Sequence, residues 1–174
     1  MIIREATPTD APAIARVHVD SWRTTYKGFV PDKVLAELSY EERENLWDRS
    51  LSQVGRDRGV FCYVAEDEAG QIVGFASGGP ERTGDAVYKG EVYAIYILQS
   101  HQGKGLGHRL MSACGDRLIK AGIRTLLVWV MAQNPACRFY EALGGVKVHE
   151  RQEAMRGIVI DEVAYGWKDL ATIK

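Results

Sequence analysis

The sequence predicts a single α/β domain over residues 1–174. Predicted strands and helices alternate along the chain. The strands have an alternating apolar pattern, and the helices have apolar residues every three or four positions. No internal repeat, low-complexity tract or linker rich in proline or serine divides the chain. A domain near this length buries roughly 70% of its unfolded surface, so one hydrophobic core is enough.

The first half of the chain is expected to form a strand, helices and a hairpin. Thr9 or Asp10 is a suitable N-cap for a first helix, which ends at Gly28. Ser39 and Glu42 have the spacing of a capping box at the start of a further helix. The other expected elements are a strand, a helical turn and two hairpin strands, at residues 2–4, 31–38, 60–66 and 71–77.

The second half is expected to alternate strands and helices. A loop from Gly78 to Asp85 leads to a long strand that ends at Leu98. The helix that follows has apolar residues four apart from Leu106 onward and ends at Gly122. The remaining expected elements are a strand, a helix and two closing strands, at residues 124–130, 134–143, 146–149 and 158–167.

Residues 102–109, Gln-Gly-Lys-Gly-Leu-Gly-His-Arg, join that long strand to that helix and have the pattern of an anion site. Glycines at 103, 105 and 107 remove the Cβ atoms that would keep successive backbone N–H groups apart, and the helix adds its free N-terminal donors. A phosphorylated ligand is therefore expected there. The segment lacks the hydroxyl of a Walker A loop and the third small residue of a dinucleotide fingerprint.

The pattern that fits is Gln/Arg-x-x-Gly-x-Gly/Ala, and it resembles the acetyl-CoA pyrophosphate loop of the GNAT N-acetyltransferase superfamily. Residues 134–145, Asn-Pro-Ala-Cys-Arg-Phe-Tyr-Glu-Ala-Leu-Gly-Gly, are similar to the Asn-x-x-Ala-x-x-Phe-Tyr-x-x-Leu-Gly-Phe segment of that superfamily. The chain departs from it at Gly145, where the family usually has an aromatic residue. The resemblance implies an α/β fold with a mixed, mostly antiparallel sheet of about seven strands, flanked by helices and splayed at the acetyl-CoA site.

The same resemblance implies an N-acetyltransferase that moves an acetyl group from acetyl-CoA to the primary amine of a small molecule. The amine is expected to attack directly in a ternary complex, with acetyl-CoA as the donor and no metal. Two alternatives stay open: a noncatalytic acyl-CoA-binding or sensor module, and an enzyme that acetylates a protein lysine or N-terminus. A homodimer is expected because small enzymes of this class frequently pair.

Glu91 and Tyr140 are the candidates for acid–base catalysis. An amine with a pKa of about 10.4 is mostly protonated at pH 7, and its deprotonation costs roughly 4.6 kcal/mol, so a base is needed. Glu91 lies where several GNAT enzymes that resemble this chain have a base, acting directly or through water; otherwise it is a solvated carboxylate. Tyr140 lies where the superfamily commonly has its general acid, and its alternative role is an aromatic side chain packed in the core.

Binding roles follow from the resemblance in the same way. Loop N–H groups would hold the diphosphate, nearby basic side chains would neutralise it or lie on a solvated face, and two strand residues would pair with the pantetheine arm. The cofactor-binding residues are then Ile97, Leu98, Gln102, Gly103, Lys104, Gly105, Leu106, Gly107, His108, Arg109, Asn134 and Tyr140, of which Asn134 is alternatively a helix cap. The acceptor pocket is expected in the first sixty residues and residues 78–85. Its candidates are Trp22, Tyr26 and Tyr93, which otherwise belong to the core.

The composition and charge of the chain limit the classes of partner that it is expected to bind. With 22 basic and 23 acidic residues and no basic stripe, the chain has no electrostatic basis for binding nucleic acid or a membrane surface. No segment approaches the 18 or so apolar residues of a membrane span, so a cytoplasmic protein is expected. The three cysteines lack Cys-x-x-Cys spacing and the four histidines are scattered, so neither a disulfide nor a metal site is expected.

Overall fold

The computed structural model describes residues 1–54 and 59–173. Its centre is a seven-stranded sheet with the strand order β1-β2-β3-β4-β5-β7-β6. The strands are β1 (Ile2–Glu5), β2 (Phe61–Glu66), β3 (Ile72–Pro80), β4 (Gly90–Ile97), β5 (Leu126–Met131), β6 (Val146–Met155) and β7 (Ile158–Trp167). The α-helices are α1 (Ala11–Thr25), α2 (Asp32–Ala36), α3 (Tyr40–Gln53), α4 (Leu106–Lys120) and α5 (Ala136–Ala142).

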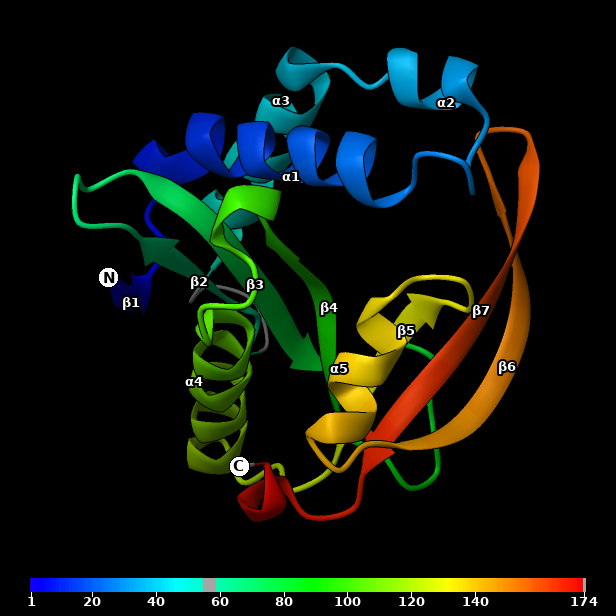
Figure 1. The fold of residues 1–174 in the computed structure, drawn as a ribbon. Coiled ribbons are helices and arrows are strands. Elements are labelled where there is room, and N and C mark those ends of the chain that lie inside the picture. The colour runs from blue at the N-terminus through cyan, green and yellow to red at the C-terminus, as the bar shows by residue number, and fades with distance from the viewer. Residues whose placement is uncertain (55–58, 174) are drawn as a thin grey trace.

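Helices cover both faces of the first part of the sheet (Figure 1). In β2, Cys62 and Val64 pack in the cluster that contains α1 and α3, whereas Phe61 and Ala65 pack in the cluster that contains α4. Successive side chains of a strand point to opposite faces, so this strand is buried on both sides. The helices α4 and α5 share the second of these clusters. Among the described residues, no helix combines the length and the apolar character that a membrane span requires.

The sheet is splayed between β4 and β5. These two strands are parallel and pair over three positions only, from Gly90 opposite Leu126 to Val92 opposite Val128, whereas every other neighbouring pair in the sheet is antiparallel. Beyond Val92, β4 continues to Ile97 without a partner on this side among residues 1–54 and 59–173. A bulge at this point of the β3–β4 ladder, between Ser77 and Gly78, increases the local bend. The predicted mixed, mostly antiparallel, splayed sheet is therefore confirmed.

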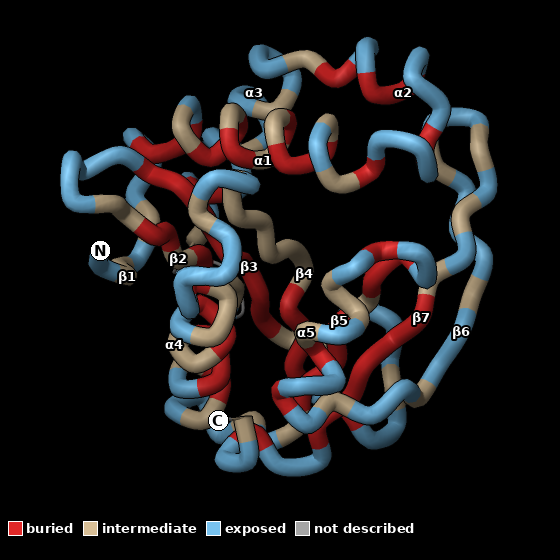
Figure 2. The backbone as a smooth tube through the Cα atoms, in the orientation of Figure 1, coloured by how far each residue is buried: buried red, intermediate tan, exposed pale blue. Residues whose placement is uncertain are grey.

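Several boundaries differ from the sequence prediction, and two of these differences have a clear structural reason. Gly78 and Gly79 belong to β3 rather than to a loop, and a Cβ atom on Gly78 would lie 2.7 Å from the main-chain oxygen of Glu91, so glycine is required by the close approach of β4. The strand β6 continues to Met155, well beyond the predicted end at residue 149. Its residues are mainly exposed, as the colours of Figure 2 show, so it lacks the alternating apolar pattern that identifies a half-buried strand.

The β6–β7 hairpin curves toward the end of α1 and toward α2 (Figure 1). Near its tip, Met155, Ile158 and Ile160 pack against the cluster that contains Trp22 and Tyr26. The guanidinium of Arg156 lies 3.6 Å from a carboxylate oxygen of Glu42 in α3. The last two long strands therefore form a wall opposite the first helix.

Ion pairs and caps fix the outer elements. The Ser39 hydroxyl accepts a hydrogen bond from the Glu42 N–H at 3.2 Å, which confirms the predicted N-cap of α3. Asp10 instead binds Arg4 at 2.7 Å, and this contact lowers the pKa of Asp10 to about 2. Arg4 also donates from Nε to Glu66 at 2.7 Å. Arg4 and Glu66 lie in the β1–β2 part of the sheet.

His18 in α1 is a partly buried histidine that the fold keeps neutral. Its Nδ1 accepts a hydrogen bond from Trp47 Nε1 at 3.2 Å, and its ring stacks on Tyr96 at 4.9 Å between centroids. Burial, assisted by the positive charge of Arg43, lowers the pKa of His18 to about 3. The unfolded chain therefore binds a proton below pH 6.5 that the folded chain does not, so stability falls as the pH falls from 6.5 toward 3.

This difference predicts a pH-dependent stability. As the pH falls from 7 to 5, His18 is expected to remove about 2 kcal/mol from the free energy of unfolding. The size of this loss does not depend on the exact pKa of His18 in the folded protein, because that pKa lies well below 5. Urea unfolding at both pH values measures it. In His18→Gln, which keeps an acceptor for Trp47, the pH dependence should shrink by this amount. An equal pH dependence in the two proteins would contradict the assignment.

Candidate active site

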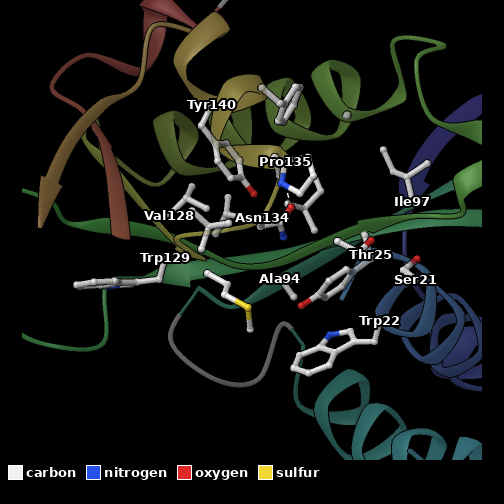
Figure 3. A pocket seen from close by; sticks show the side chains of 18 of the residues that line it. Ser21, Trp22, Thr25, Ala94, Ile97, Val128, Trp129, Asn134, Pro135 and Tyr140 are labelled. Atoms are coloured by element: carbon white, nitrogen blue, oxygen red, sulfur yellow. Dashed lines mark hydrogen bonds between the residues drawn. The ribbon is translucent and has the colours of Figure 1, made fainter. Parts of the chain in front are cut away.

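A cavity of about 730 Å³ lies where β4 and β5 separate. Its walls are the end of α1, the strand β4, residues 102–108, the strand β5, the start of α5 and the β6–β7 hairpin. Figure 3 shows Trp22 and Tyr140 on opposite sides of this space and Trp129 at one end. The predicted site residues that line it are Trp22, Tyr26, Glu91, Tyr93, Ile97, Gln102, Gly103, Gly105, Gly107, His108, Asn134 and Tyr140.

The glycine-rich loop has the geometry of an anion cradle. Gly103 and Gly105 have φ values of 72° and 77°, and a Cβ atom on either would meet no atom within 4 Å from the described residues beyond its chain neighbours. Among the described residues, the N–H groups from Gly103 to His108 form no hydrogen bond with the protein. Gly105 is the N-cap of α4, so these donors surround the positive end of a helix of 15 residues. A diphosphate would fit this set of donors.

The loop is fixed to its neighbours by two contacts. The Gln102 side chain donates from Nε2 to the main-chain oxygen of Ile97 at 3.0 Å, which ties the loop to the end of β4. A Cβ atom on Gly107 would lie 3.0 Å from the Phe139 ring. Gly107 is therefore needed for the close packing of α4 on α5.

Four predicted cofactor residues contribute differently from the sequence expectation. The Leu106 side chain is buried in the core, so only its main chain faces the cradle. Lys104 and Arg109 do not line the cavity, and Arg109 donates instead to the main-chain oxygen of Met1 at 3.2 Å. The Leu98 N–H donates to the main-chain oxygen of Val73 at 2.9 Å, so this N–H is unavailable to a ligand.

The open side of β4 can still pair with an extended chain. Because the Leu98 N–H is directed toward β3, the alternate main-chain groups, those of Ile97 and Ile95, face away from β3. In the described part of the chain, no strand pairs with β4 on that side beyond Val92. The part of β4 beyond Val92, which ends at Ile97, runs from the middle of the cavity toward the glycine-rich loop.

Tyr140 projects from α5 into the cavity (Figure 3). Burial raises its pKa, so the hydroxyl stays protonated near neutral pH. Among the described residues, this hydroxyl has no hydrogen-bond partner. Tyr140 is therefore a proton donor, with no partner in the described part of the chain, that points into the cavity.

The departure at Gly145 has a structural cause beneath α5. A Cβ atom on Gly145 would lie 2.6 Å from the Trp167 ring, so the indole occupies the space next to this glycine. Trp167 donates from Nε1 to the Leu143 oxygen at 2.9 Å and packs edge-on against Tyr140. Trp167 thus supports α5 and the catalytic candidate that it carries.

Glu91 lies at the other side of the cavity, and its side chain is only 2% exposed. Its Oε2 accepts hydrogen bonds from Arg82 N and Nε, both at 3.1 Å, and its Oε1 accepts one from Arg82 Nη2 at 2.6 Å. A carboxylate oxygen has two acceptor positions, so Oε1 keeps one free. The contact with Arg82 was not predicted from the sequence, which indicated only a solvated carboxylate as the alternative.

The predicted acceptor residues also have defined partners. Tyr26 accepts a hydrogen bond from Asn134 Nδ2 at 3.1 Å, and Asn134 Oδ1 accepts one from Ala136 N–H at 2.9 Å, so this side chain caps α5. The Tyr93 hydroxyl donates to the Pro80 oxygen at 2.6 Å, and burial raises the pKa of Tyr93 to about 12. The Trp22 indole N–H, by contrast, is buried and has no hydrogen-bond partner among the described residues.

Sequence reasoning missed a second arginine–carboxylate pair in the cavity. Arg151 in β6 binds Oε2 of Glu162 in β7 from both Nε and Nη2, at 2.8 and 2.7 Å. Its guanidinium lies 4.0 Å from the centre of the Trp129 ring in β5. Arg151 and Glu162 are direct cross-strand partners, so only the register of the hairpin brings them together.

Other candidate chemistries have little support among the described residues. Burial raises the pKa of the Cys62 thiol to about 12 and also raises those of Cys114 and Cys137, which disfavours a reactive thiolate. No group of three histidine, cysteine, aspartate or glutamate side chains within residues 1–54 and 59–173 is placed to hold a metal.

The cradle predicts a selective effect of one methyl group. Gly105→Ala and Gly122→Ala both add a Cβ atom at a positive φ, at opposite ends of α4 and in open space, so each should cost about 1 kcal/mol of stability. Only Gly105→Ala should also weaken coenzyme A binding, about tenfold or more, because the methyl group enters the diphosphate space. Calorimetric titration with coenzyme A measures this. Equal affinities in the two variants would exclude this loop as the site.

A donor cradle next to the open side of a strand suits a transferase that uses coenzyme A. The family model for the acetyltransferase (GNAT) family matches residues 19–145. The chain is 43% identical over 173 residues to the uncharacterized N-acetyltransferase YuaI of Bacillus subtilis, covering 99% of this chain and 95% of that protein. The chain therefore belongs to the GNAT acetyltransferase family, and it is an acetyl-CoA-dependent N-acetyltransferase.

Two further comparisons concern the acceptor and the donor. An L-methionine sulfoximine/L-methionine sulfone acetyltransferase of Salmonella typhimurium is 32% identical over 85 residues, which span 48% of this chain and 50% of that protein. A putative acetyltransferase from Salmonella typhimurium, solved with its cofactor acetyl-CoA, has the same fold. It has a TM-score of 0.70 and 24% identity and covers 97% of this chain and 93% of its own.

Proposed function

We propose that the protein transfers the acetyl group of acetyl-CoA to the primary amine of a small molecule, by direct attack in a ternary complex. The observation that carries this proposal is that one cavity contains the diphosphate cradle, the open side of β4, Tyr140 and Glu91. Bound acetyl-CoA would supply an activated acetyl thioester. The N–H groups of residues 103–108 would hold its diphosphate, and Ile95 and Ile97 would pair with its pantetheine arm.

The roles of the two catalytic candidates follow from their surroundings. Glu91 removes the proton of the acceptor ammonium through the free position on Oε1, directly or through one water, so that the neutral nitrogen can form the new bond to the acetyl carbon. Tyr140 donates its hydroxyl proton to the sulfur that leaves as the carbon–sulfur bond breaks. The nitrogen, positively charged after it bonds to the acetyl carbon, then loses its second proton, which restores the Tyr140 hydroxyl. The products are an acetamide, a free thiol and the proton taken up by Glu91.

Two observations favour a small acceptor and a direct transfer. Both carboxylates at the acceptor end of the cavity, Glu91 and Glu162, are paired with arginines, so the cavity is not the open acidic groove that a basic peptide would need. The buried cysteines have raised pKa values, which disfavours an acyl-enzyme on sulfur. The relative that acts on methionine sulfoximine is also consistent with a small amine acceptor.

Purified protein, acetyl-CoA and a panel of amines and peptides test the proposal. Acetyl transfer is followed by thiol release and by the mass gain of each acceptor, with Tyr140→Phe as the background. Small amines should gain an acetyl group, whereas lysine-containing and N-terminal peptides should not. Transfer to peptides alone would assign the cavity to a protein substrate, and thiol release at the Tyr140→Phe level for every acceptor would count against the proposed function.

A further inference from the structure

Arg82 occupies a fixed place at the mouth of the cavity. It follows the end of β3, in a turn that the Glu81 carboxylate organises by accepting hydrogen bonds from the N–H groups of Thr83, Gly84 and Asp85, at 2.6, 2.8 and 2.8 Å. Its guanidinium lies 4.0 Å from the centre of the Tyr93 ring. Both the main chain and the side chain of Arg82 are therefore held in position before any ligand binds.

Only one edge of this guanidinium is used by the protein. The Nε and Nη2 atoms bind Glu91, whereas Nη1 forms no hydrogen bond among the described residues. The Arg82 side chain is 58% exposed, although the Glu91 carboxylate beneath it is 2% exposed. Arg82 thus neutralises a buried carboxylate and keeps a second edge available for a planar anion.

The charges at this end of the cavity are matched in pairs. Arg82 with Glu91 and Arg151 with Glu162 each form an ion pair, and each guanidinium stacks on an aromatic ring that also lines the cavity. Among the described residues that line this end, a polyamine would therefore meet only carboxylates that are already paired, and it would face the free edge of Arg82. An acceptor that carries its own negative charge would instead be attracted to the guanidinium group.

We propose that the acceptor amine carries a carboxylate close to its amino group, as an α-amino acid does, and that the free edge of Arg82 binds this carboxylate. This inference rests on the proposed function. Because Arg82 touches Glu91 directly, a carboxylate on its other edge lies near the base, and an amino group one carbon away comes within reach of Glu91 or of one bridging water. The side chain of the acceptor would face the apolar surface that Met131, Met155 and Ile160 contribute.

Matched acceptors test this inference. Leucine, methionine, glutamine and phenylalanine are each compared with the corresponding amide and with the amine that lacks the carboxyl group, by kcat/KM for acetyl transfer. At least one free amino acid should exceed its own amide and amine by about tenfold or more. The amide has the less basic amino group and is less protonated at neutral pH, so without recognition of the carboxylate it should be the faster substrate.

Arg82→Lys keeps a positive charge beside Glu91 and removes the planar fork. In this variant the preference for the free amino acid over its amide should fall about tenfold. Arg4→Lys makes the same substitution at an arginine that pairs with Asp10 and Glu66 outside the cavity, and it should leave the preference unchanged. A loss by the same factor for all three acceptor types in Arg82→Lys would show that Arg82 serves only Glu91, and it would overturn the inference.

A binding measurement separates this inference from the proposed function. Calorimetry with coenzyme A already bound compares each N-acetyl amino acid with its N-acetyl amide, which requires no turnover. Tighter binding of at least one free acid, weakened in Arg82→Lys, supports the inference even if no acceptor is acetylated, which would defeat the proposed function alone. Equal binding of acids and amides, or faster turnover of the amides in the wild-type protein, would overturn it.

Discussion

Replacing Tyr140 by phenylalanine is expected to lower kcat about 100- to 1,000-fold, the usual contribution of one positioned acid or donor. The change removes a hydroxyl that points into the cavity without a partner and keeps the ring that packs against Trp167 and Tyr165. Steady-state acetyl transfer at saturating substrates measures the loss.

Coenzyme A affinity provides the control for this variant. The cradle is formed by main-chain N–H groups of residues 103–108, which Tyr140→Phe does not touch, so the dissociation constant should change little. A variant that keeps wild-type kcat would remove Tyr140 from the chemistry. A variant that loses coenzyme A binding to the same extent as kcat would assign it to cofactor binding instead.

The second large effect is expected at Glu91. Glu91→Gln keeps an acceptor for Arg82 but removes the base, so kcat/KM near neutral pH should fall about 100-fold. The defect should shrink as the pH rises toward the pKa of the acceptor amine, because an amine that arrives neutral needs no base. A pH profile of kcat/KM for both proteins measures this convergence.

Glu66→Gln is the matched control for Glu91→Gln. Glu66 also pairs with an arginine, Arg4, but lies outside the cavity, so its replacement should affect stability rather than the pH profile. Parallel pH profiles for Glu91→Gln and the wild-type protein would mean that another group or bulk water accepts the proton. In that case Glu91 would only hold Arg82 in place.

The parts of the fold that the sequence predicts well are those set by local patterns. The capping serine of α3 and the glycines that begin and end α4 act within a few residues of the chain, so their spacing is enough to place them. The splayed seam was predicted only through the resemblance to GNAT enzymes. Nothing in the local pattern of β4 or β5 indicates that they pair over three positions.

The proposed acceptor end of the site depends on contacts between distant segments. Arg151 meets Glu162 because of the register of the hairpin, and it meets Trp129 because β5 lies beside β7. A shift of one residue would turn these side chains to the other face of the sheet. The exposed and charged sequence of β6 gave no signal of its length, so this wall of the cavity could not be predicted from the sequence.

The separation of these contacts along the chain has a consequence for how the enzyme can change. The groups that would grip the donor belong to residues 95–108 and to α5, whereas the opposite wall is formed by the end of α1, by Arg82 and by the β6–β7 hairpin. If the site works as proposed, substitutions in the hairpin should alter which amine is accepted and leave the grip on coenzyme A intact. Descendants of one ancestral gene could diversify in substrate while retaining a common donor.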